Sequence, residues 1–151
     1  MNKFYLVVDL LYQRLSNNEN VNTTIVAKKG DEDLYKKNIY PLAVINPVSA
    51  DHSSSKVTYF SFEIGVLDQR DISKSVATDK FDGNDDYIDN LNITDTIIDD
   101  LVGYLRTQNN DFLIELDSVS DTSKIEMEGF NLLDGWYIKL KLSIPNTQNY
   151  C

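Results

Sequence analysis

The chain has one histidine, His52, which stands in a serine-rich stretch directly after Asp51. An acid, an imidazole and a hydroxyl are the groups of a hydrolytic triad, in which the histidine activates the nucleophile. A triad needs a rigid scaffold that orients the base, whereas residues 48–55 have the composition of an exposed hairpin tip. We therefore expect His52 to be a solvated loop residue, and we predict no catalytic residue and no enzymatic activity.

An acidic run that contains Asp82, Asp85 and Asp86 is the second candidate for chemistry. Clustered carboxylates can hold a hard cation such as Ca²⁺, and the EF-hand loop is the most specific pattern of this kind. Counted from Asp82, Tyr87 occupies the position that requires glycine and Ile93 the position that requires glutamate. The pattern fails, so we expect a solvated acidic loop with no metal and no cofactor. A looser cation site, serving an enzyme, stays open as a third-ranked alternative.

Composition excludes several other classes of function. The net charge of -10 and the pI of about 4.4 oppose binding of nucleic acid, because phosphate neutralisation needs clustered Lys and Arg. The single cysteine, Cys151, cannot form a disulfide within one chain. No apolar run reaches the ~20 residues of a membrane span, and we expect no membrane contact and no secretory signal. The nine Tyr and six Phe are not interleaved with basic residues, which favours core and subunit contacts.

Residues 1–151 are expected to form one domain with its own core. The most regular alternation of apolar and polar residues, at 136–144, predicts a strand with one buried face. We predict further strands at 21–28, 42–46, 57–67, 112–116 and 124–130. Asp134-Gly135 is expected to make the tight turn before the last strand, so that this strand pairs back with 124–130. Pro41 and Pro47 are expected to bound strand 42–46, which pairs antiparallel with 57–67.

Apolar residues at helical spacing predict two amphipathic helices, at 3–18 and 93–108, the second with Thr94 as its N-cap. The stretch 68–90 lacks periodicity and is expected to be a long connection of functional or mobile character. The order is helix, three strands, helix, three strands. It predicts an α+β fold, with a mainly antiparallel β-sheet and two amphipathic helices packed on one face.

Several features in this order also carry a resemblance that spans nearly the whole chain. They are the N-terminal helix through Leu15, the strands Tyr40–Ile45 and Thr58–Ile64, the helix at 93–108, and the ending Leu133-Asp134-Gly135-Trp136 with its final strand. In this combination the chain resembles the tail-terminator or tail-completion proteins of tailed bacteriophages. The resemblance implies a structural virion protein, assembled in the host cytoplasm. Such a protein forms a hexameric or dodecameric ring, contacts other connector or tail proteins, and lets genomic DNA pass without specific binding.

A ring built from heterologous contacts joins one surface of a subunit to a different surface of the next, and hairpins and acidic loops suit such contacts. The candidate ring-contact residues are Asp51, His52, Lys56, Asp82, Asp85 and Asp86. An acidic bore would keep DNA mobile, which makes Asp95, Asp99 and Asp100 of the second helix candidate lumen residues. The main alternative is a small acidic adaptor module that masks a basic protein partner.

Overall fold

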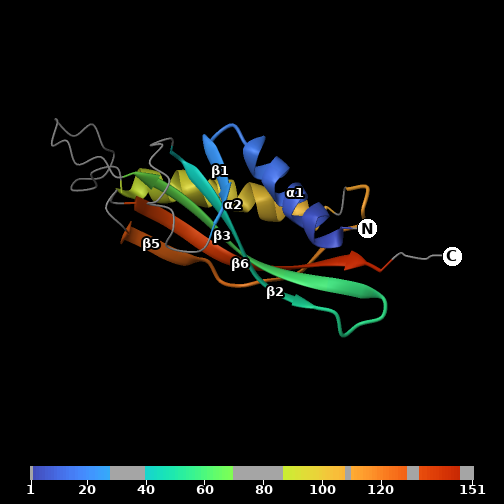
Figure 1. Cartoon of the computed structure of the whole chain (residues 1–151). Helices are drawn as coiled ribbons and strands as arrows, with labels where there is room; N and C mark the ends of the chain where they lie inside the picture. The colour runs from blue at the N-terminus through green and yellow to red at the C-terminus, as the bar shows by residue number, and fades with distance from the viewer. Residues whose placement is uncertain (1, 28–39, 70–86, 108–109, 129–132, 147–151) are drawn as a thin grey trace, which may run out of the picture.

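The computed structural model describes residues 2–27, 40–69, 87–107, 110–128 and 133–146 (Figure 1). The elements in chain order are α1 (Lys3–Ser16), β1 (Thr23–Val26), β2 (Leu42–Asp51), β3 (Val57–Gln69), α2 (Tyr87–Arg106), β4 (Glu115–Val119), β5 (Ser123–Glu128) and β6 (Leu133–Pro145). This order confirms the predicted α+β fold. Asp82, Asp85 and Asp86, and most of the predicted connection at 68–90, lie outside the described residues.

The strands form one sheet in the order β1-β2-β3-β6-β4, and β5 also pairs with β6. The central strands β3 and β6 pair antiparallel over their whole length, from Val57 with Pro145 to Gln69 with Leu133. β2 pairs antiparallel with β3 as predicted, whereas the short edge strand β1 runs parallel to β2. The sheet is therefore mainly antiparallel, with one parallel pair at its edge.

Both helices pack on the same face of this sheet, as predicted (Figure 1). α1 lies over β1 and β2, and α2 lies over β3 and β6. The predicted alternation of β6 is confirmed, because its apolar side chains are buried beneath the helices with those of β3, namely Ile138, Leu140, Leu142, Ile144, Phe60, Phe62, Ile64 and Val66. Each fully buried side chain of this size contributes about 1.5–3 kcal/mol of transfer free energy. This layer is the main core.

The prediction that Asp134-Gly135 forms a hairpin turn is wrong. Both residues lie inside β6, where Gly135 pairs with Leu67 of β3 and Ile125 of β5. A Cβ atom built on Gly135 would lie 1.9 Å from the carbonyl oxygen of Val66. Glycine is needed here because another backbone approaches closely, which is the second common reason for glycine in a strand. The predicted pairing of the two last strands is nevertheless confirmed.

Thr94 is not the N-cap of the second helix. α2 begins at Tyr87, and the buried Thr94 hydroxyl donates a hydrogen bond to the carbonyl oxygen of Asn90 at 2.6 Å. A threonine inside a helix satisfies its hydroxyl in this way, so its preference for caps does not decide where the helix begins. The first turns are held by tertiary contact, since the indole Nε1 of Trp136 donates to the carbonyl oxygen of Leu91 at 2.8 Å.

Pro47 does not end the strand that it was predicted to bound. β2 continues to Asp51 through an irregularity in its register between Pro47 and Ser49. Among the described residues, β1 pairs only with Leu42–Ile45, so at Pro47 no second described strand needs the missing N–H group. The outer half of β2 and the start of β3 form a hairpin arm, which the N-terminal end of α1 contacts through Lys3 at Thr58 and Phe4 at Phe60.

Candidate functional site

Three of the predicted ring-contact residues, Asp51, His52 and Lys56, lie together and exposed at the tip of the β2–β3 hairpin. The Asp51 carboxylate accepts a hydrogen bond from the backbone N–H of Ser53 at 2.9 Å. Hydrogen bonds from the Ser53 side chain and backbone hold the pKa of Asp51 below its usual value. The tip therefore presents a carboxylate at neutral pH, next to the exposed side chain of Lys56.

His52 packs against the core rather than against Asp51. Its ring meets the ring of Phe60 edge to face, with centroids 6.2 Å apart and an interplanar angle of 87°. In a triad the imidazole would bridge the carboxylate and the nucleophilic hydroxyl. Here Ser53 binds the carboxylate of Asp51, so the arrangement at the tip differs from that of a triad and resembles an ordered turn.

A polar network fastens the tip of the hairpin to α1 and to the end of β6. The backbone N–H of Asn146 donates to the carbonyl oxygen of Lys56 at 2.8 Å, and its side-chain Nδ2 donates to that of Ser54 at 3.3 Å. Lys3 Nζ donates to the buried Thr58 hydroxyl at 2.9 Å and also to Asn146 Oδ1. These bonds join three separate elements, so they hold the tip rigidly.

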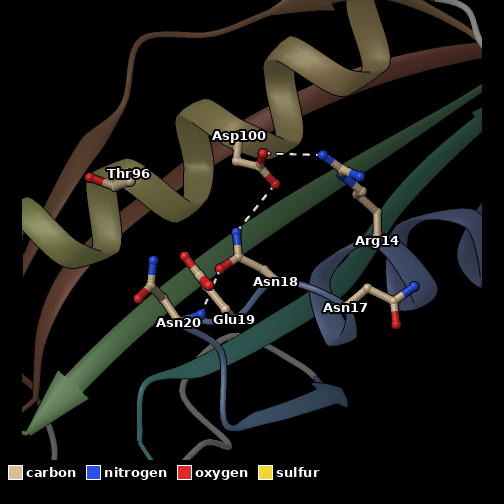
Figure 2. A pocket seen from close by; sticks show the side chains of 7 residues that line it. All are labelled: Arg14, Asn17, Asn18, Glu19, Asn20, Thr96 and Asp100. Atoms are coloured by element: carbon tan, nitrogen blue, oxygen red, sulfur yellow. Dashed lines mark hydrogen bonds and ion pairs between the residues drawn. The ribbon is translucent and has the colours of Figure 1, made fainter.

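The predicted lumen residues on α2 occupy two different environments. Asp95 and Asp99 are exposed on the outer surface of the helix. Asp100 faces α1, where its Oδ1 lies 3.1 Å from Nη2 of Arg14 and its Oδ2 accepts a hydrogen bond from Nδ2 of Asn18 at 3.2 Å (Figure 2). Asp95 and Asp99 can present charge to a ligand, whereas Arg14 neutralises Asp100.

The Arg14–Asp100 pair lies beside a hollow of about 350 Å³ between the two helices (Figure 2). Its lining side chains are polar or charged, namely Arg14, Asn17, Asn18, Glu19, Asn20, Thr96 and Asp100. The guanidinium of Arg14 also lies 4.4 Å from the centre of the Tyr104 ring. These contacts hold the C-terminal half of α1 against α2. The side-chain amides of Asn17, Asn18 and Asn20 line the remaining cleft, where they can form hydrogen bonds with a polar chain segment.

The described part of the chain has no cluster of three His, Cys, Asp or Glu side chains that could hold a metal ion. Neither described helix has the length and apolar character needed to cross a bilayer.

Analysis of the sequence missed an acidic pair at the end of the central strands, in which Asp134 is buried and Asp68 is half-buried. Asp68 of β3 and Asp134 of β6 are direct cross-strand neighbours, and Asp134 has 0% of its surface exposed. Burial raises the pKa of Asp68, and the charge of Asp134 raises it further, against the lowering effect of a hydrogen bond from the N–H of Gln69. The sequence analysis did not identify Asp134 as a strand residue, because it interpreted the Asp-Gly dipeptide as a turn.

Two exposed apolar surfaces were also missed. One is a groove lined in part by Tyr5, Val8 and Tyr12 of α1 and by Val26 of β1. The other consists of Phe112 and Leu113, in the turn that leads into β4. The spacing of Tyr5, Val8 and Tyr12, which form a second apolar stripe on the first helix, is the signal that could have revealed the groove.

No protein-family model matches this chain, and no curated protein sequence matches it either.

Proposed function

We propose that this protein is a structural subunit of the head–tail connector or tail of a bacteriophage virion. It assembles into a ring that joins portal or adaptor to tail and lets genomic DNA pass. The observation that carries the proposal is the anchored β2–β3 hairpin, which presents Asp51, His52 and Lys56 exposed at its tip. A heterologous ring needs one part of each subunit to reach a different surface of the next, and an exposed hairpin tip can supply that contact.

The rigidity of this arm supports the same role. Because Asn146 and Lys3 fasten the tip to the end of β6 and to α1, little conformational entropy is lost when the tip meets a neighbouring subunit. A contact of modest size can then suffice for assembly.

The exposed carboxylates of Asp95 and Asp99 support an acidic bore. Fixed negative charge repels the phosphate backbone, so DNA would slide past the ring without being retained. Asp100 contributes less to this field, since its charge is paired with that of Arg14.

The test is the mass of the purified chain, by size-exclusion chromatography with light scattering, over a range of protein and salt concentrations. A hexamer or dodecamer, seen as rings by negative-stain microscopy, is the expected result. Lys56→Glu reverses the charge at the hairpin tip and should weaken the ring, whereas Lys124→Glu, distant from the tip on β5, is the matched control. A chain that remains monomeric in all conditions and alongside its structural neighbours contradicts the proposal.

The exposure of Asp95 and Asp99 favours one second candidate, an acidic adaptor that masks a basic protein. Such a module would stay monomeric or dimeric. It would bind a cationic protein with an affinity that falls as salt concentration rises.

A further inference from the structure

We draw no further inference here: the strongest candidate, the apolar groove that Tyr5, Val8 and Tyr12 of α1 form with Val26 of β1, carries none, because nothing in the described part of the chain shows what covers it.

Discussion

Replacing Asp68 by Asn should stabilise the fold at neutral pH and leave it unchanged in acid. Asp68 lies opposite the buried Asp134, and its pKa is raised above the usual 3.8 mainly by burial and then by that neighbouring charge. Since the folded pKa is the higher one, ionised Asp68 costs stability at every pH above it. The cost fades as the pH falls through the folded pKa and is absent below 3.8, where both states are protonated.

The size of the effect follows from the cross-strand geometry. Like charges directly opposite on antiparallel strands cost about 0.2–1 kcal/mol. Asn keeps an oxygen at the position from which Asp68 Oδ1 accepts a hydrogen bond from the N–H of Gln69 at 2.8 Å. Only the charge is therefore lost. For a chain of this size, 1 kcal/mol corresponds to roughly 2–4 °C in the melting temperature.

The assay is thermal unfolding followed by circular dichroism, at pH 7 and at about pH 3 in the same salt. Asp68→Asn should raise the melting temperature by up to about 4 °C at pH 7 and by almost nothing in acid. The control is Asp95→Asn, at an exposed position. A lower melting temperature at pH 7, or an equal gain at both pH values, would show that the reasoning is wrong.

Three further predictions concern packing, the helix clasp and the acidic face. Gly135→Ala should cost at least about 1–3 kcal/mol in denaturant unfolding, because the new Cβ meets the backbone of β3, whereas Gly103→Ala in open space should stabilise α2 by about 0.5–1 kcal/mol. Arg14→Met should cost only about 0–1 kcal/mol, since its ion pair with Asp100 is half exposed, and a double-mutant cycle with Asp100→Asn should show coupling of that size. In assembled particles, Asp95→Asn with Asp99→Asn should slow DNA ejection at low salt and leave ring formation intact. An unchanged rate of DNA ejection would refute the proposal that α2 lines the bore of the ring.

The sequence was sufficient for the parts of the fold that depend on periodicity. β6 shows alternation, and α2 shows the apolar stripe that contains Ile97 and Leu101, because each element buries a single face. A pattern of this kind can be recognised in the sequence alone. The errors arose where a residue type has two physical uses. Gly135 allows the backbone of β3 to approach closely and does not form a turn. Thr94 donates a hydrogen bond to a carbonyl oxygen within α2 and does not cap the helix.

The candidate surfaces depended more on contacts that no local pattern contains. Adjacent residues Asp99 and Asp100 point in different directions on α2, and only the position of Arg14 on α1 shows which one is neutralised. The groove requires Val26 to lie beside Tyr5 and Tyr12, and the exposed turn before β4 requires Leu113 to adopt a positive φ. Of the hairpin tip predicted at 48–55, residues 52–55 do form the turn, because clustered serines mark a turn wherever the strands are packed, whereas residues 48–51 belong to β2.

The net charge of -10 makes salt the variable that separates the two proposed functions. Copies of an acidic chain repel one another at low salt, and an apolar contact between copies becomes stronger as salt screens that repulsion. An acidic module that captures a basic partner loses affinity over the same range, because salt screens the attraction on which it depends. Self-association that strengthens with salt therefore favours a ring, and partner binding that weakens with salt favours an adaptor. The two functions therefore differ in the force that drives association, which is apolar burial between like-charged copies in a ring and attraction between opposite charges in an adaptor. The distinction does not depend on any one acidic residue.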